Sequence, residues 1–328
     1  MFYKDKRVLV TGGTGMIGRS LVEMLLAAGA RVRVSSMDDP SRAHPDAEFR
    51  QANLTRFDNC LDVCRDIDYV FHLVGVKGSP AMTAKFPANF FVPVILFNTN
   101  MMEAARQAGV QNYLFTSTVG VYAPAEVFHE DDVWKTFPSE NDKFAGWAKR
   151  MGELQAEAYA IQYGWNRISI VRPANVYGPY DNFDPNNAMV IPSLIRRALG
   201  GENPFTVWGD GSPVRDFIHA HDVARGMMLV MEKGYTKPVN LGSGVGITIR
   251  ELVEIVVDNL ETKPKVVWDS SKPSGDKRRV MDISRARSLG FEPQVSFQAG
   301  IRDVMDWYRQ NKDAAAKRYN VFTESKPV

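Results

Sequence analysis

A glycine-rich turn near the start of the chain constrains the fold more than any other feature. The run TGGTGMIG directly follows the β-branched strand pattern of residues 7–11 and opens a helical pattern. A second strand pattern, at residues 31–36, completes a strand–helix–strand unit of about 30 residues. Gly12 permits a tight turn, Gly15 lets the backbone approach a pyrophosphate, and Gly18 lets helix and strand pack closely. This context favours a dinucleotide-binding turn over a merely structural one.

The end of the second strand bears on the type of dinucleotide. Ser36 precedes Asp38, and Arg42 follows a few residues later. A hydroxyl and a guanidinium suit the 2′-phosphate of NADP, so the sequence slightly favours NADP over NAD. In the alternative interpretation Arg42 is solvated and the Asp38 carboxylate binds the ribose 2′-hydroxyl of NAD.

Strand and helix patterns continue to alternate along the first half of the chain. Apolar strand patterns occupy residues 69–75, 112–118 and 166–173, and helical patterns occupy residues 91–109 and 143–164. Such alternation is typical of a parallel sheet covered by helices on both faces. The sequence therefore predicts an α/β fold with a doubly wound parallel sheet of the Rossmann type.

The alternation breaks after Pro173, and residues 178–189 are rich in Pro, Asn and Asp, which predicts a loop. We expect a smaller α/β substrate-binding region that is interleaved with the main sheet. The predicted dinucleotide-binding domain comprises residues 1–172 and about 216–243, and the predicted substrate region comprises residues 173–215 and 244–328.

The overall charge excludes some partners. Lys+Arg 40 against Asp+Glu 38 gives a net charge of +2, which offers no field for attracting nucleic acid or an anionic membrane. The sequence shows no signal peptide and no apolar run of the ~20 residues that a membrane span needs. Cys60 and Cys64 have no further His or Cys nearby, so neither a disulfide framework nor a metal site is expected. We expect a soluble, cytoplasmic protein.

Five motifs follow one another along the chain, each occurring once: TGGTGMIG, FHLVG, FTSTVGVY, VRPANVYGP and VWGDGSPVRDFIHAHDVARG. Together with Lys149 they resemble the extended short-chain dehydrogenase/reductases, the NAD(P)-dependent nucleotide-sugar epimerases and dehydratases. The resemblance covers nearly the whole chain. The segment GPYDNFDPNNAMVIPSLIRRAL is similar in particular to the GDP-fucose synthase branch.

The resemblance implies two catalytic residues. Thr118 takes the position of the family's active-site hydroxyl and would hydrogen-bond a sugar oxygen during hydride transfer. Lys149 takes the position of the family's lysine, which binds the nicotinamide ribose and lowers the pKa of a neighbouring acid. A threonine buried at a strand end and a solvated helix lysine are the alternative interpretations.

The resemblance also implies two sets of binding residues. Those expected to bind the cofactor are Gly12, Gly15, Met16, Ile17, Gly18, Ser36, Arg42, Asn53, Leu54, Leu73, Val74, Gly75, Lys149, Pro173, Asn175 and Val176. Those expected to bind a nucleotide-sugar substrate are Thr118, Val119, Asn175, Asn187, Val190, Arg197, Trp208, Arg215 and Arg278. Arginine suits a diphosphate because its guanidinium forms bidentate bonds; a surface ion pair for each arginine, and a core role for Trp208, are the alternatives.

The sequence departs from the family pattern at the site itself. The family's catalytic tyrosine lies four residues before the lysine, and Ala145 stands there. The Cys/His pair of GDP-fucose synthases aligns with Gly120 and Met189, neither of which transfers a proton. The acidic pair of the 4,6-dehydratases is missing as well, because Val119 and Gly120 occupy its positions. Double epimerisation and dehydration are therefore not expected.

Two functions remain open at this point. The first is an enzyme that carries out pyridine-nucleotide redox at a sugar carbon of a GDP-type sugar, as an epimerase or as a reductase or dehydrogenase. The second is a non-catalytic binder of NAD(P) and a nucleotide sugar, which the missing phenol favours. The family pairs the helices at about residues 91–108 and 143–163 between two subunits, so we also expect a homodimer.

Overall fold

A parallel sheet forms the centre of the protein, seen in a computed structural model that describes residues 1–76, 78, 80–272, 275–315 and 319. Within that part of the chain, seven strands pair in the order β10-β6-β5-β4-β1-β2-β3, and every neighbouring pair is parallel. The predicted Rossmann-type α/β fold is confirmed. The strands are β1 (Arg7–Thr11), β2 (Arg31–Ser36), β3 (Glu48–Gln51), β4 (Tyr69–His72), β5 (Asn112–Thr116), β6 (Ile168–Pro173) and β10 (Val239–Leu241).

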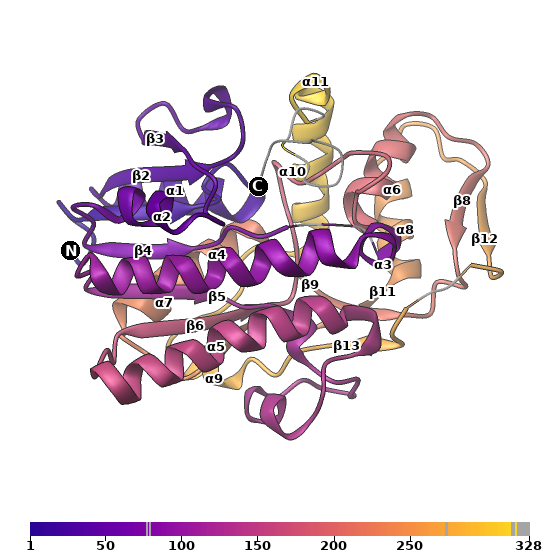
Figure 1. Cartoon of the computed structure of the whole chain (residues 1–328). Coiled ribbons are helices and arrows are strands. Elements are labelled where there is room, and N and C mark those ends of the chain that lie inside the picture. The colour runs from indigo at the N-terminus through magenta and orange to yellow at the C-terminus, as the bar shows by residue number, and fades with distance from the viewer. Residues whose placement is uncertain (77, 79, 273–274, 316–318, 320–328) are drawn as a thin grey trace.

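Helices cover both faces of this sheet (Figure 1). On one face α1 (Met16–Ala27) packs against α7 (Ala220–Glu232). On the other face α4 (Pro87–Gln107) lies between α2 (Phe57–Cys64) and α5 (Lys143–Tyr163) and packs against both. Figure 1 shows α4 and α5 side by side in front of the strands. This is the doubly wound arrangement that the alternating patterns predicted.

The central strands are buried on both faces. Val8 and Val10 of β1 belong to the core under α1 and α7, whereas Leu9 belongs to the core under α2, α4 and α5. The same alternation places Phe71 of β4 in the first core and Val70 in the second. Burial on both faces explains why the sequence of each strand is almost continuously apolar.

A second region lies at the right in Figure 1. Its smaller sheet contains β9 (Val214–His219), which pairs with β7 (Asn175–Tyr177), β11 (Gly246–Thr248) and β13 (Arg278–Arg279). A separate two-stranded arm pairs β8 (Phe205–Trp208) with β12 (Val266–Asp269). Around these strands lies a third apolar core, which includes residues of α6 (Val190–Leu199), α8 (Ile249–Asp258), α10 (Phe297–Gln310) and α11 (Lys312–Ala315).

Element boundaries differ from the predicted ones by a few residues. Helix α4 begins at Pro87, four residues before the predicted start at 91, and contains Pro93. The edge strand β3 was not predicted, because its residues are mostly exposed and polar. The remaining short elements are η1 (Pro40–Arg42), α3 (Pro80–Lys85), η2 (Val119–Val121), η3 (Glu130–Lys135), η4 (Glu140–Asp142) and α9 (Ser284–Ser288). A search of the described helices finds none with the length and apolarity to cross a bilayer.

A fully buried ion pair joins helix α5 to the sheet. Arg172 of β6 and Glu153 of α5 lie 2.7 Å apart, and both side chains are shielded from solvent. The Ser117 hydroxyl, just after β5, donates to Glu153 Oε1 at 2.5 Å, and Arg172 Nη1 donates to the Tyr122 hydroxyl at 3.0 Å. Because each charge is paired and hydrogen-bonded, removing either partner would leave an uncompensated buried charge.

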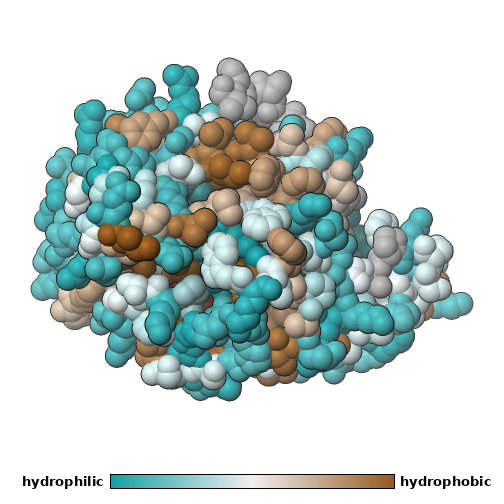
Figure 2. All heavy atoms as spheres, turned by 60° about the horizontal axis from the view of Figure 1, so that its bottom comes forward, coloured by the Kyte–Doolittle hydropathy of each residue, from teal (hydrophilic) through white to brown (hydrophobic). Residues whose placement is uncertain are grey.

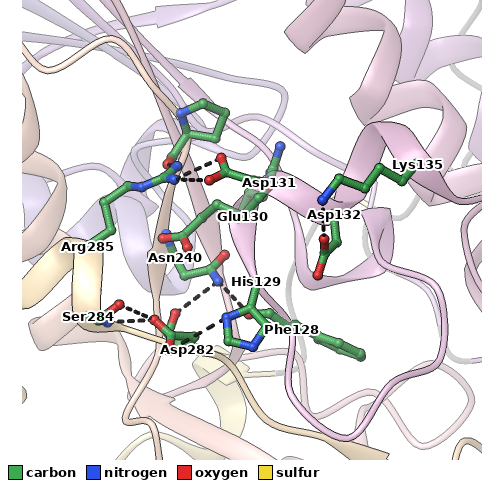
Figure 3. A network of polar contacts seen from close by, with 12 residues as sticks. Phe128, His129, Glu130, Asp131, Asp132, Lys135, Asn240, Asp282, Ser284 and Arg285 are labelled. Atoms are coloured by element: carbon green, nitrogen blue, oxygen red, sulfur yellow. Dashed lines mark hydrogen bonds and ion pairs between the residues drawn. The ribbon is translucent and has the colours of Figure 1, made fainter.

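A second buried network is centred on Asn240, the middle residue of strand β10 (Figure 3). The Asn240 side chain donates to the backbone carbonyls of Phe128 and Asp282, at 3.0 Å each. Its Oδ1 accepts from the Tyr122 hydroxyl at 2.6 Å, and its backbone N–H donates to Glu130 Oε1 at 3.0 Å. One asparagine thereby joins three separate segments of the chain under the sheet.

Candidate functional site

A cavity of about 360 Å³ lies at the carboxyl ends of the central strands. Its wall contains Gly12 after β1, Ser36 at the end of β2, Ala52 after β3 and Leu73 after β4. The strand order reverses between β1 and β4, so the cavity occupies the switch point of a doubly wound sheet. Ligands of open α/β sheets bind at this position.

Most residues predicted to bind the cofactor lie together in this wall. They are Gly12, Gly15, Met16, Ile17, Gly18, Ser36, Asn53, Leu54, Leu73, Val74 and Gly75. Arg42, Lys149, Pro173, Asn175 and Val176 are not among the lining residues. Their contact with a cofactor remains a prediction.

The glycine turn is packed too closely for side chains at Gly12 and Gly18. Gly12 has φ +71°, a conformation that favours glycine, and a Cβ atom there would lie 3.1 Å from the Val74 backbone. A Cβ atom on Gly18 would lie 2.3 Å from the Gly12 carbonyl oxygen. The turn and the start of α1 are thus in direct contact, as a pyrophosphate-binding turn requires.

The start of helix α1 is suited to an anion. Gly15 is the N-cap, no described side chain caps the helix, and its first turn contains no acidic residue. The first backbone N–H groups and the positive end of the helix dipole therefore face the cavity without a competing carboxylate. The residues present fit the pyrophosphate of NAD or NADP.

Asp38 follows β2 and lines the cavity. It is buried, and its Oδ2 accepts a hydrogen bond from the Thr14 hydroxyl at 2.7 Å. Its Oδ1 accepts from the backbone N–H of Tyr319 at 2.9 Å. Arg42 does not line the cavity, and its Nε lies 3.8 Å from Asp38 Oδ2. Of the two residues, Asp38 and not Arg42 lines the cavity.

Other lining residues were not predicted from the sequence. Pro93 and Phe97 reach the cavity from α4, and Tyr319 reaches it from near the C-terminus. A loop after β7 closes one side with Asp181, Asn182, Asp184 and Asn187, of which only Asn187 was predicted, as a substrate residue. No local motif marks these positions, because they reach the cavity only through packing of distant segments.

Lys149 lies on α5, where its ammonium group meets α4 and β5. Its Nζ donates to Asn98 Oδ1 at 3.4 Å and lies 5.0 Å from the centre of the Phe115 ring. Burial lowers the pKa of Lys149 to about 7, although the negative charge of Glu153 opposes this shift. The lysine can therefore exchange a proton near neutral pH.

Thr118 and Ala145 lie on neighbouring elements, after β5 and on α5. Thr118 follows β5 and is half-buried; its Oγ1 accepts from the Gly120 backbone N–H at 3.2 Å. Ala145 and Lys149 both lie on helix α5, one turn apart and on the same side. A tyrosine at position 145 would thus share a helix face with the lysine.

Two of the predicted substrate arginines form ion pairs. Arg197 on α6 pairs with Glu202 and also donates to the Thr206 carbonyl. Arg278 on β13 pairs with the Glu126 carboxylate at 3.5 Å and donates to the Glu126 carbonyl at 3.0 Å. The ion-pair interpretation describes both guanidinium groups in this structure, and their contact with a substrate remains a prediction.

Arg215 lies beside a second arginine that the sequence analysis missed. Arg215 of β9 is in register with Arg279 of β13, and Arg279 pairs with Asp142 at 2.5 Å and with Asp276. Burial and the neighbouring charge of Arg279 lower the pKa of Arg215 to about 10. Two guanidinium groups held side by side favour binding of an additional anion.

The remaining predicted residues are spread around the second region. Pro173 ends β6 beside the end of β5, and the Asn175 side chain donates to the Asp216 carbonyl at 2.9 Å. Val176 lies in β7, Val190 is the first residue of α6, and Trp208 ends β8 with 61% of its surface exposed. The core interpretation of Trp208 is therefore wrong. Among the described His, Cys, Asp and Glu side chains, no group of three is placed to hold a metal ion.

The parallel sheet, the glycine turn and the cavity at the switch point define a dinucleotide-binding protein of the Rossmann type. The sequence matches the NAD dependent epimerase/dehydratase family over residues 8–242. The chain belongs to this family, and its cofactor is accordingly NAD or NADP.

Individual relatives extend the similarity over almost the whole chain. GDP-L-fucose synthase 1 of Arabidopsis thaliana is 32% identical over 317 residues, which cover 94% of each chain. The dTDP-4-dehydro-6-deoxy-D-allose reductase of a Streptomyces species is 30% identical and covers 94% of this chain and 98% of its own. Among solved structures, the epimerase Mth375 of Methanothermobacter thermautotrophicus superposes with a TM-score of 0.86 at 28% identity, covering 96% of this chain and 95% of its own.

Proposed function

We propose that the protein is an NAD(P)-dependent enzyme that carries out redox chemistry at a sugar carbon of a nucleotide sugar. The observation that carries this proposal is the glycine-lined cavity at the switch point, with Lys149 on the adjacent helix layer. The relatives support the substrate class, because their names denote a GDP-L-fucose synthase and a dTDP-sugar reductase. The reaction is an epimerisation or a reduction.

The chain's own residues have separate tasks in this reaction. When bound, the nicotinamide accepts or donates a hydride at the sugar carbon. Thr118 hydrogen-bonds the sugar oxygen, whose charge changes as the hydride moves. Lys149 holds or releases the proton of that oxygen, directly or through a water, because its pKa lies near 7.

The redox state of the cofactor in freshly purified protein tests the proposal. An epimerase returns the hydride to the sugar and should retain NAD(P)+, whereas a reductase should have a site that fills with NADPH or NADH. Absorbance at the reduced-nicotinamide band, followed by turnover assays with GDP- and dTDP-linked keto sugars, distinguishes the two. Tight cofactor and sugar-nucleotide binding without turnover would instead support the non-catalytic binder that the loss of tyrosine at position 145 favours.

We further propose that NAD is preferred to NADP, because Asp38 lines the cavity and Arg42 does not. A carboxylate accepts a hydrogen bond from the ribose 2′-hydroxyl but repels a 2′-phosphate. Asp38→Asn should therefore raise NADP affinity relative to NAD by about tenfold or more, the effect of ~1.4 kcal/mol. Fluorescence titration with both cofactors measures the ratio, and Asp39→Asn, one residue away and outside the cavity wall, serves as the control. A ratio that is the same in both variants would contradict the proposal.

We propose that Arg215 binds the diphosphate of the substrate. Arg215→Ala should weaken binding of GDP-L-fucose by about 2–3 kcal/mol, the effect of losing a charge-assisted hydrogen bond. Affinity for NAD(P) should change little, since Arg215 does not line the cofactor cavity. Isothermal calorimetry with both ligands measures the two effects. An equal loss for both ligands, or none for GDP-L-fucose, would show that Arg215 is structural.

We propose that the protein is a homodimer through α4 and α5. An exposed apolar stripe runs along α5 through Phe144, Met151, Leu154 and Ile161, and Val92 of α4 is also exposed. The spacing of the four α5 residues keeps them on one face of that helix. Figure 2 shows apolar side chains gathered in patches on one side of the molecule. Contiguous apolar surface of this kind is typical of subunit interfaces.

Leu154→Glu should convert this dimer to a monomer, because it places a charge in the middle of the stripe. Sedimentation velocity measures the change. Val245→Glu, at an exposed valine near β11, is the matched control and should leave the dimer intact. A wild-type protein that sediments as a monomer at every concentration would contradict the proposal.

A further inference from the structure

A chain of side-chain hydrogen bonds connects the first strand of the sheet to Lys149. Thr11 Oγ1 at the end of β1 lies 3.0 Å from His72 Nδ1 at the end of β4. His72 Nε2 lies 3.0 Å from Asn98 Oδ1 on α4, and the same Oδ1 lies 3.4 Å from Lys149 Nζ. Thr11, His72 and Asn98 are all buried.

The protons in this chain can be placed from the number of acceptors. Thr11 Oγ1 already accepts the backbone N–H groups of Leu73 and Val74, at 3.1 and 3.2 Å, which uses both of its lone pairs. Its own hydrogen must therefore be donated to His72 Nδ1. Burial and the charge of Lys149 lower the pKa of His72 to about 3, so the ring is neutral and carries its proton on Nε2.

This tautomer fixes the orientation of the Asn98 amide. His72 Nε2–H donates to Asn98, so the oxygen and not the NH₂ group must face the histidine. The oxygen then also faces Lys149, which has only donors when it is charged. Asn98 Nδ2 is buried and has no hydrogen-bond partner among the described residues, and rotating the amide would direct it at two donors.

We propose that Asn98 is a positioning residue for Lys149. Its carbonyl oxygen, oriented by Thr11 and His72, holds the lysine ammonium group where α5 meets α4. The preceding residue, Phe97, lines the cavity, and so do Leu73 and Val74, whose N–H groups bind Thr11. One hydrogen-bonded unit thus sets both the cavity wall and the lysine. The inference deepens the proposed function, since it assumes that Lys149 acts at this cavity.

Several groups around Lys149 affect its pKa besides Asn98. Glu153 on the same helix favours the charged lysine, and burial opposes it. From β4, His72 stays neutral above about pH 3 and does not titrate with the lysine. Asn98 is the polar contact from α4, and its oxygen stabilises the ammonium form.

The pH dependence of Lys149 acetylation tests this role without any assay of turnover. Acetic anhydride reacts with the neutral amine only, and mass spectrometry quantifies modification at position 149 in the cofactor-free protein. In Asn98→Leu the midpoint should fall by about one pH unit, a tenfold larger ratio of neutral to charged amine at a given pH, because the acceptor is lost. In Asn98→Asp it should rise, because a negative charge replaces the amide.

Asn100→Leu is the matched control. Asn100 lies on the same helix and donates to the Thr55 carbonyl at 2.9 Å, without a contact to Lys149. In Asn100→Leu the pH midpoint of Lys149 acetylation should equal that of the wild type. Opposite shifts for Leu and Asp at position 98 support the inference, whereas no shift or shifts in the same direction would overturn it. If Asn98→Leu does not fold, the Asp variant alone decides: a midpoint at or below that of the wild type overturns the inference.

The result is separable from the proposed function. If the two Asn98 variants show these shifts but the wild-type protein binds neither NAD nor NADP, the role of Asn98 stands and the proposed reaction is wrong. A protein that binds NAD(P) but shows no shift would keep the reaction and lose the role of Asn98.

Discussion

Lys149→Met is expected to abolish turnover while leaving the fold intact. Lys149 lies one helical turn after the position of the missing phenol, and the buried ion pair of Glu153 and Arg172 does not include it. Methionine has a similar length and suits the apolar surroundings of Phe115. Turnover of a nucleotide-linked keto sugar measures the loss, and circular dichroism with thermal melting checks the fold.

The pH profile of the wild-type enzyme follows from the same group. In the reductive direction the sugar oxygen gains a proton, so the charged lysine is the active form. Since the pKa of Lys149 is lowered to about 7, the rate should be highest below that pH and fall as the pH rises through it. If Lys149→Met stays fast and keeps the same dependence of rate on pH, the proton travels by another route.

Ala145→Tyr is expected to raise the rate. Position 145 lies one helical turn before Lys149, so a phenol there would share the helix face of the lysine. General acid–base catalysis is typically worth ~10²–10⁴-fold, and a well-placed phenol should supply part of that factor. The measurement is kcat on the same keto sugar, with KM determined in parallel.

The control for this substitution is Ala145→Phe, which adds the ring without the hydroxyl. A gain with Tyr and none with Phe would assign the effect to proton transfer. Equal gains would mean that the ring acts by packing. A wild-type enzyme that is already fast, and that Tyr slows, would mean that Ala145 belongs to a different proton pathway.

The fold was predictable because its signals are local. Strands β1 and β2 and helix α1 are encoded by consecutive residues around the glycine turn, so their bounds agree closely with the pattern. The same locality explains the cavity wall: Gly12, Ser36 and Leu73 each lie at or just after the end of a parallel strand, and such ends meet at one edge of the sheet.

The rest of the site depends on contacts between distant segments. Phe97 and Asn98 reach the site because α4 packs between β4 and α5, and nothing in their own sequence marks them. Arg279 becomes a neighbour of Arg215 only through the register of two short strands. Asp38 and Arg42 were both visible in the sequence, but only the structure shows which of them faces the cavity.

The buried pair of Glu153 and Arg172 has a consequence for how such a protein can evolve. It ties α5 to β6 and to Ser117 one turn beyond Lys149, whereas position 145 lies one turn before the lysine and takes no part in it. Position 145 therefore contributes to the apolar packing of α5 but not to this ion pair. A substitution that removes or restores a phenol there leaves the charged link between α5 and the sheet in place, so selection can act on the proton donor without breaking that link.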